Sequence, residues 1–188
     1  WEYDCGTNPH RNPSHMKRIF IALWPDRQTA NALERVSTGW SWPVQCRKYP
    51  PQDLHLTLQF IGACADEKIA RLRHELRVPI EPFTIVLDTP RRWAKGLVVL
   101  CPAVIPDALI NLHETLAQLL RASEVAFDDR RLRPHVTLAR HGADIALPES
   151  CQPITWTVQE YALIQSTGDP RRRYVALQTY GSNHGQRG

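Results

Sequence analysis

Hydrophobic residues along the chain follow two kinds of spacing, and each kind predicts a different element. Short apolar or alternating runs bounded by turn-forming residues are typical of strands. We expect strands at 18–23, 52–62, 83–87, 97–100, 135–139, 155–164 and 174–179. Apolar residues spaced three and four apart are typical of one face of a helix. We expect helices that begin near Pro25, Asp66 and Pro106.

The second and third predicted helices show the clearest apolar stripes. Asp66 is placed to cap the second helix, whose buried residues would be Ile69, Leu72 and Leu76. The third helix carries a leucine stripe made of Leu109, Leu112, Leu116 and Leu119. Strands outnumber helices and do not alternate strictly with them, which favours an α+β fold over a doubly wound parallel sheet.

A four-residue pattern occurs twice, first as His55-Leu56-Thr57-Leu58 and again as His135-Val136-Thr137-Leu138. Each copy closes a stretch that includes a predicted helix, so the repeat predicts two duplicated lobes whose similar strands face each other. Side chains alternate along a strand, so each His and Thr should share one face while the apolar residues pack on the core.

Two imidazoles around one phosphate have the chemistry that a phosphodiester reaction needs. One can take a proton from attacking water and the other can give one to the leaving oxygen, because the unperturbed imidazole pKa is about 6.5. The hydroxyls of Thr57 and Thr137 can donate to the non-bridging phosphate oxygens. Either motif alone is more typical of ordinary strand residues than of a catalytic site. The catalytic interpretation rests on the matched pair.

Arginines cluster near the second motif and near the last strand. They are Arg130, Arg131, Arg133, Arg140, Arg171, Arg172 and Arg173. Guanidinium groups suit phosphate oxygens, although such runs are also typical of solvated surfaces. Strict alternation would place Arg140 on the leucine face unless the strand ends or bulges at Ala139.

Composition narrows the class of protein. The 188 residues fit one domain or two small fused lobes, with 43% hydrophobic residues and a net charge of +4. No apolar run approaches the length of a transmembrane helix, and the run at 19–23 is too short for a signal-peptide core. We therefore expect a cytoplasmic protein without a membrane partner. Residues 1–15 are polar and turn-rich, and we expect them to be a non-native extension or tag, with the domain spanning 16–188.

Metal and cofactor motifs are missing from the sequence. The five cysteines include no C-x-x-C pair, and the eight histidines include no H-x-x-x-H pair. The glycines form no phosphate-binding loop of the Walker or dinucleotide type. We expect free thiols, no metal and no cofactor.

These residues together resemble the two-histidine phosphoesterase superfamily, and most closely the bacterial and archaeal RNA 2′,3′-cyclic phosphodiesterases, once called 2′-5′ RNA ligases. The resemblance rests on residues 18–23 (RIFIAL), 54–62 (LHLTLQFIG), 93–100 (WAKGLVVL), 134–140 (PHVTLAR) and 163–166 (LIQS). It covers residues 17–179. The arginine-rich turn before Tyr174 resembles the family in kind and not in sequence.

The resemblance implies a bilobal fold with antiparallel sheets around a central cleft, helices outside and no cofactor. It implies that 2′,3′-cyclic phosphates at RNA ends, tRNA fragments among them, are opened to 2′-phosphates. His55 would give a proton to the 3′ oxygen and His135 would activate water. Thr57, Thr137 and Arg140 would bind the phosphate. Further substrate contacts would come from Phe60, Arg133, Ser166 and Tyr174.

Three related functions stay open. The same two histidines could catalyse the reverse reaction, which joins a 5′-hydroxyl end in a 2′-5′ linkage without ATP. An enzyme of the same superfamily could instead act on 2′-5′ oligonucleotides or small cyclic nucleotides. A non-catalytic RNA-binding relative could retain the cleft, although two intact motifs argue against it. We expect a monomer.

Overall fold

The computed structural model describes residues 16–181. The non-native extension expected at 1–15 lies outside the described residues. The strands are β1 (Met16–Leu23), β2 (Arg47–Lys48), β3 (Leu56–Ala65), β4 (Phe83–Leu87), β5 (Thr89–Trp93), β6 (Leu97–Cys101), β7 (Val136–Arg140), β8 (Ile154–Val158), β9 (Glu160–Ser166) and β10 (Tyr174–Gly181). The helices are α1 (Arg27–Thr38), α2 (Asp66–Glu75) and α3 (Asp107–Ala122), with short 3₁₀ turns at Pro51–Asp53 and Ala94–Gly96.

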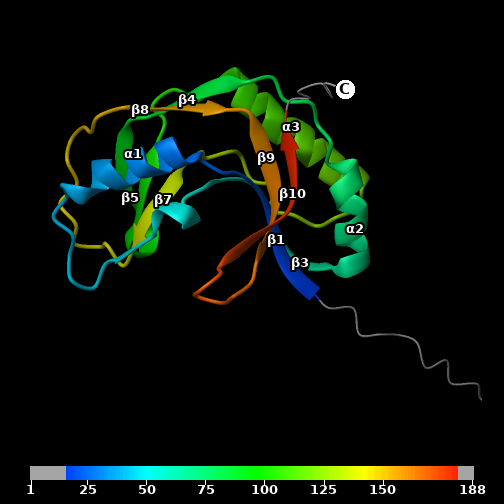
Figure 1. Cartoon of the computed structure of the whole chain (residues 1–188), viewed down its shortest axis with the longest axis horizontal. Helices are drawn as coiled ribbons and strands as arrows, with labels where there is room; N and C mark the ends of the chain where they lie inside the picture. The colour runs from blue at the N-terminus through cyan, green and yellow to red at the C-terminus, as the bar shows by residue number, and fades with distance from the viewer. Residues whose placement is uncertain (1–15, 182–188) are drawn as a thin grey trace, which may run out of the picture.

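The strands form one long antiparallel sheet and one small one. The long sheet has the order β10-β9-β1-β3-β7-β6-β5, and β2 adds to β7, while β4 pairs with β8 alone. Strands β3 and β7 meet at the single pair Leu56–Val136, so the long sheet divides there into two halves. Figure 1 shows β1, β3, β9 and β10 on one side and β5 and β7 on the other. The expected bilobal α+β fold is confirmed.

The two halves repeat one order of elements. In one, β1 leads through α1 to β3, and in the other, β6 leads through α3 to β7. Both helices start at a Pro-Asp pair, Pro25-Asp26 and Pro106-Asp107, and the Asp26 carboxylate accepts from the Thr29 N–H at 2.7 Å. Helix α3 packs on β3 of the other half, and α1 packs on β8. Helix α3 thus covers a strand of the opposite half of the long sheet, and α1 covers a strand of the small sheet.

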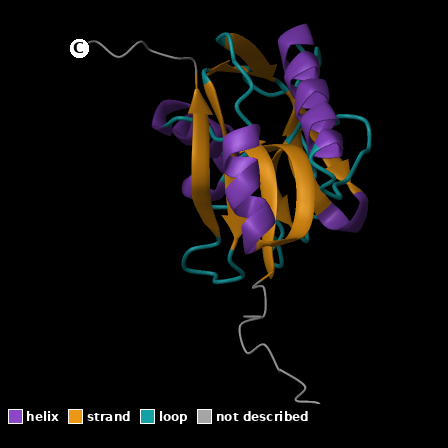
Figure 2. Ribbon diagram, turned by 90° about the vertical axis from the view of Figure 1, so that its right-hand side faces the viewer, coloured by secondary structure: helices purple, strands orange, loops and turns teal. Residues whose placement is uncertain are grey.

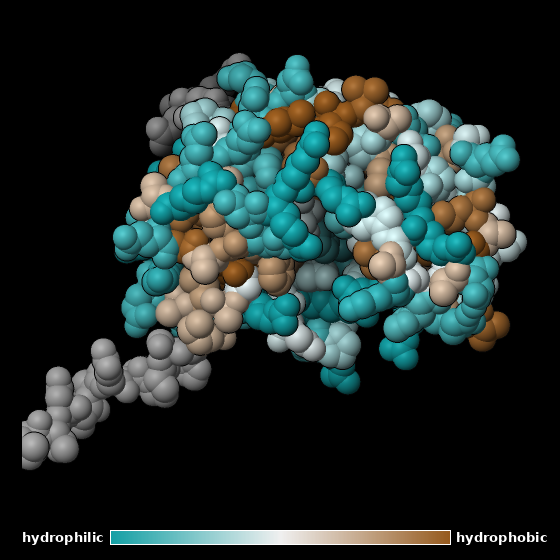
Figure 3. All heavy atoms as spheres, turned by 180° about the vertical axis from the view of Figure 1, so that it is seen from behind, coloured by the Kyte–Doolittle hydropathy of each residue, from teal (hydrophilic) through white to brown (hydrophobic). Residues whose placement is uncertain are grey.

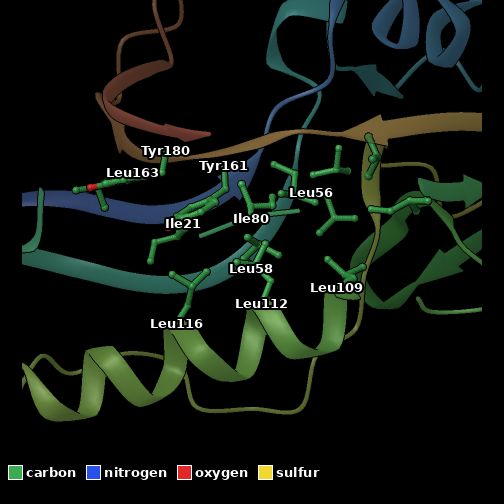
Figure 4. Close-up of a cluster of buried hydrophobic side chains, with 14 of the residues drawn as sticks. Ile21, Leu56, Leu58, Ile80, Leu109, Leu112, Leu116, Tyr161, Leu163 and Tyr180 are labelled. Carbon is green, nitrogen blue, oxygen red and sulfur yellow. The ribbon is translucent and has the colours of Figure 1, made fainter. Parts of the chain in front are cut away.

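Helices lie on the outer faces of the sheets, and the core lies between them (Figure 2). The leucines of α3 point toward Ile21 of β1 and Leu56 and Leu58 of β3 (Figure 4). Leu109 and Leu116 are fully buried. Hydrophilic side chains cover much of the molecule seen from behind (Figure 3). Burial of the leucine stripe of α3 is what holds this helix on the sheet.

Both strands that carry the repeated motifs contain a β-bulge at the same motif position. Ala22 pairs with Thr57 and Ile21 pairs with Gln59, so the register skips Leu58. In the other half, Val99 pairs with Thr137 and Val98 with Ala139, so it skips Leu138. A bulged strand puts two successive residues on one face, and the alternation beyond it is inverted.

Three sequence predictions about elements were wrong. The strand expected at 155–164 is two strands, β8 and β9, which separate at Gln159 and belong to different sheets. Strands β2 and β5 were not expected, because their charged residues and Pro90 lack an apolar alternation and their pairing comes from β7 and β6. Ala65 occupies the N-cap position of helix α2 without a side-chain capping bond, and Asp66 forms an ion pair with Lys17 at 2.8 Å.

The leucine stripe of α3 also needs one correction. Leu120 is fully buried, whereas Leu119 is half-buried, so the inward stripe ends one position later than the spacing predicted. Within residues 16–181, no helix has the length and apolar character to cross a bilayer.

Candidate active site

His55 and His135 occupy equivalent places, one residue before β3 and one residue before β7. Each is half-buried and each ring is fixed by the main chain two residues earlier. The Nδ1–H of His55 donates to the Asp53 carbonyl at 2.7 Å, and that of His135 donates to the Arg133 carbonyl at 2.8 Å. A carbonyl only accepts, so Nδ1 keeps its proton and Nε2 is the nitrogen left to exchange one.

The meeting point of the two halves brings both motifs together. Leu56 pairs antiparallel with Val136, and both are fully buried. Extending this register by one residue sets His55 opposite Thr137 and Thr57 opposite His135. Because neighbouring residues point to opposite faces, these four polar side chains lie on the face away from the core. All four are half-buried, as an open cleft would leave them.

Burial lowers the pKa of both imidazoles. Desolvation brings the pKa of His55 down to about 4, with the Asp53 hydrogen bond opposing the shift and the charge of His135 adding to it. Desolvation also lowers the pKa of His135, against the Arg133 hydrogen bond and with the Arg133 charge. Both rings are therefore neutral at pH 7 when no anion is bound, and each Nε2 presents a lone pair.

Aromatic rings form the walls around the two histidines. The ring of Trp24 stacks on His55 at a centroid distance of 4.9 Å and an interplanar angle of 9°. Tyr174 meets His55 edge-on at 4.9 Å, and Phe20 lies 5.2 Å away. On the other side, Trp93 lies 4.4 Å from His135. These rings cover part of each imidazole and reduce its contact with water.

Sequence reasoning gave no role to Phe20 and Trp24, although a signal was present. Ile19 and Ile21 are fully buried, and Phe20 lies between them on the opposite side of β1. Apolar residues on both faces of a strand indicate that both faces are covered. Here the second cover is the aromatic wall of the cleft, made of Phe20, Trp24 and Tyr174.

The bulge at Leu138 decides where Arg140 points. Leu138 and Ala139 are both buried, and Arg140 is exposed on the side of Thr137. Its guanidinium lies over the Tyr49 ring at 5.6 Å. Strict alternation would have placed Arg140 on the leucine face, and the bulge turns it to the face of Thr137 instead.

Arg140, Ser166 and Tyr174, three of the predicted site residues, line one pocket of about 390 Å³. Ser166 pairs with Tyr174 across β9 and β10, and the Tyr174 ring borders His55. The pocket therefore opens beside the first histidine.

The remaining predicted contacts lie around the pair. Arg133 covers the Trp93 ring at 4.5 Å, beside His135. Phe60 is 41% exposed, follows the bulge at Leu58 and lies beneath Arg18 at 5.7 Å. Arg130 instead pairs with Asp128 and, with Arg131, lines a different pocket beside α3. The arginine run before the second motif therefore divides between the site and another surface.

Potential metal ligands are scattered across the part of the chain that the structure describes. No group of three His, Cys, Asp or Glu side chains gathers there. Cys46, Cys64, Cys101 and Cys151 carry free thiols.

Comparison with known proteins finds relatives whose sequences match this chain along most of their length. Residues 25–170 match the family model described as 2′-5′ RNA ligase superfamily. The RNA 2′,3′-cyclic phosphodiesterase of Escherichia coli is 30% identical over 173 residues, which cover 89% of this chain and 97% of that protein. The protein of the same name from Thermus thermophilus is 29% identical over 196 residues, which cover 90% of this chain and 93% of that protein.

Solved structures agree with these sequence matches. E. coli LigT complexed with 3′-AMP superposes with a TM-score of 0.81 at 25% identity, over 90% of this chain and 99% of that one. A structure described as a phosphoesterase gives a TM-score of 0.81 at 25% identity, over 89% and 99%.

Proposed function

This chain belongs to the 2′-5′ RNA ligase superfamily of two-histidine phosphoesterases, and from this premise we propose that it hydrolyses 2′,3′-cyclic phosphates at RNA ends to 2′-phosphates. The observation that carries the proposal is the matched pair of imidazoles. Each has its Nδ1–H bound to a carbonyl and its Nε2 left for proton exchange. Two such nitrogens on one polar face suit a reaction that takes one proton and gives another.

The proposed reaction is an in-line attack of water on the cyclic phosphorus. His135 takes a proton from the water as its oxygen bonds to phosphorus. The bond from phosphorus to O3′ breaks, His55 gives its Nε2 proton to O3′, and the phosphate stays on O2′. The cyclic ester holds its leaving oxygen in place, which lowers the cost of positioning it.

This division of roles requires a charged His55, whose pKa in the empty cleft is about 4. An anionic phosphodiester beside the ring favours the charged form and raises that pKa. The bound phosphate thus favours protonation of His55, which later gives this proton to the leaving oxygen. His135 needs no such shift, because a neutral ring is the form that accepts a proton.

Thr57, Thr137 and Arg140 are the proposed phosphate-binding groups. The two hydroxyls lie on the same face as the histidines, and the guanidinium projects on that face beyond the bulge. Donors placed at the non-bridging oxygens stabilise the charge that shifts there in the transition state. The rings of Trp24 and Tyr174 border the site beside His55. Phe60, Arg133 and Ser166 are proposed to contact the rest of the RNA.

Ligation is a second reaction open to the same groups. If a 5′-hydroxyl replaces water, attack on the cyclic phosphorus joins two RNA ends through a 2′-5′ linkage. The number of P–O bonds is unchanged and no ATP is consumed, so the direction would follow the concentrations of the ends.

Product analysis on an RNA that ends in a 2′,3′-cyclic phosphate tests the proposal directly. The protein is first treated with a chelator, and we expect turnover to a 2′-phosphate without added metal. A 3′-phosphate product, or activity restored only by a divalent ion, would contradict the mechanism. Cleavage of 2′-5′ oligonucleotides or small cyclic nucleotides alone would identify the related enzyme class, and binding without turnover would identify an RNA-binding relative.

A further inference from the structure

Beside the histidines, the 390 Å³ pocket has a marked positive character. It is lined by Arg47, Lys48, Tyr49, Arg140, His141, Ser166, Gly168, Pro170, Arg173 and Tyr174. Four of these ten residues are Arg or Lys, and none is Asp or Glu. A pocket with this lining selects an anion.

Two of the four cations of the pocket lie over one aromatic ring. Arg140 lies over Tyr49 at 5.6 Å and Arg173 lies over the same ring at 5.5 Å. Arg173 is also held by the Asp53 carboxylate at 3.6 Å. Among the ion pairs formed within residues 16–181, none involves Arg47, Lys48 or Arg140. The Lys48 ammonium lies over the Trp42 ring at 5.9 Å, on the buried face that its partner Ala139 occupies. Arg47 and Arg140 are therefore the side chains whose charge stays available to a ligand in the pocket.

Main-chain pairing places these cations at a fixed distance from the motif. Arg47 pairs with Arg140, and Lys48 pairs with Ala139, across β2 and β7. The Tyr49 N–H donates to the carbonyl of the bulged Leu138 at 2.8 Å. The short strand β2 thus attaches Arg47 beside Arg140, next to the same bulge that turns Arg140 to the polar face.

The pocket continues into the histidine site through Tyr174, whose ring lies 4.9 Å from that of His55. We propose that this pocket binds the phosphate on the 5′ side of the nucleoside whose 2′,3′-cyclic phosphate is opened. The inference rests on the proposed function. It narrows the substrate class to ends that carry a 5′ phosphate group, either as a monoester or as the phosphodiester to the preceding nucleotide.

The chemistry of a nucleotide supports this choice. When the cyclic phosphate lies between His55 and His135, the remaining charged group of the terminal nucleotide is the phosphate on O5′. The base and the ribose are neutral and cannot account for a pocket of unpaired cations. A charge-assisted hydrogen bond to phosphate is stronger than a neutral one, so a group there should strengthen binding measurably.

Three substrates with the same base separate the pocket from the histidine site. They are a nucleoside 2′,3′-cyclic phosphate with a free 5′-hydroxyl, the same molecule with a 5′-phosphate, and a dinucleotide ending in the cyclic phosphate. With wild-type protein, we expect kcat/KM to be about 10-fold higher or more for the two substrates with a 5′ phosphate group. The gain should appear mainly in KM, because no bond to the 5′ phosphate forms or breaks in the reaction.

Arg47→Ala is the variant, since its side chain is exposed and only its main chain serves β2. It should remove most of the advantage of the 5′ phosphate while leaving the rate on the 5′-hydroxyl substrate within about twofold. Arg73→Ala on α2 is the matched control, with the same loss of charge on an exposed outer helix. It should preserve the advantage.

The outcomes distinguish this inference from the proposed function. If wild-type protein opens none of the three substrates, the proposed function fails. If it opens all three with equal kcat/KM, the phosphodiesterase activity stands and the pocket assignment is wrong. The pocket assignment is also wrong if Arg47→Ala lowers all three rates equally, or if Arg73→Ala has the same effect as Arg47→Ala.

Discussion

The Nδ1–H of His113 donates to the main-chain carbonyl of Leu58 at 2.9 Å, so a helix side chain holds the bulge of the first motif. The neighbouring Gln59 side chain is buried and donates to the His113 carbonyl at 2.9 Å. In the other half, the bulged Leu138 carbonyl accepts from the Tyr49 N–H instead. A bulge leaves main-chain groups outside the ladder, and both halves supply a partner from a distant segment.

This bond predicts different effects for two substitutions of His113. His113→Leu leaves the Leu58 carbonyl without its donor and should lower the free energy of unfolding by about 1–3 kcal/mol. His113→Asn offers an amide N–H in nearly the same place and should recover part of that loss. Urea unfolding of the three proteins measures the difference. Equal stability of the Leu variant and the wild type would show that the bond does not hold the bulge.

The two histidines should both be essential to turnover, with opposite roles. His55→Ala and His135→Ala should each lower kcat by about 10²–10⁴-fold, and the double variant should lose far less than the product of the two. With a leaving group that needs no proton, His55→Ala should recover much of its rate while His135→Ala should not. Recovery in His135→Ala alone would reverse the assignment of acid and base.

The lowered pKa of His55 predicts that folding stability falls in mild acid. The folded-state pKa is about 4 and the ordinary value is 6.5, so the unfolded chain binds the proton first as the pH falls. The contribution is near zero at pH 7 and should reach a loss of about 2 kcal/mol by pH 5. His55→Gln should remove most of this loss when unfolding is compared at the two pH values. A loss of the same size in the variant would place the effect in other groups.

Salt should weaken RNA binding through the arginines of the site. Each phosphate contact on a single strand contributes a slope of about −0.7 in log K against log salt concentration. Few phosphates are engaged at an RNA end, so the total slope should be shallow, and Arg140→Ala should reduce it by about that amount. Binding to a non-hydrolysed RNA end at several salt concentrations checks this. An unchanged slope in the variant would remove Arg140 from the phosphate contacts.

The sequence by itself determined the α+β class, the repeat and the two histidines. Apolar spacing reports local burial, and two copies of one motif are visible without a structure because each copy is contiguous. The three helices and most strands lie near their predicted places for the same reason. The strand predicted at 155–164 was wrong because apolar alternation does not show that the chain changes sheets at Gln159.

Tertiary structure alone decided the geometry around those motifs. The bulges at Leu58 and Leu138 depend on which strands pair, and they determine the faces of Phe60 and Arg140. Arg47 of β2 lies beside the site only because β2 pairs with β7. Local periodicity carries no information about partners supplied by distant segments, and a one-residue change of register reverses the direction of every later side chain.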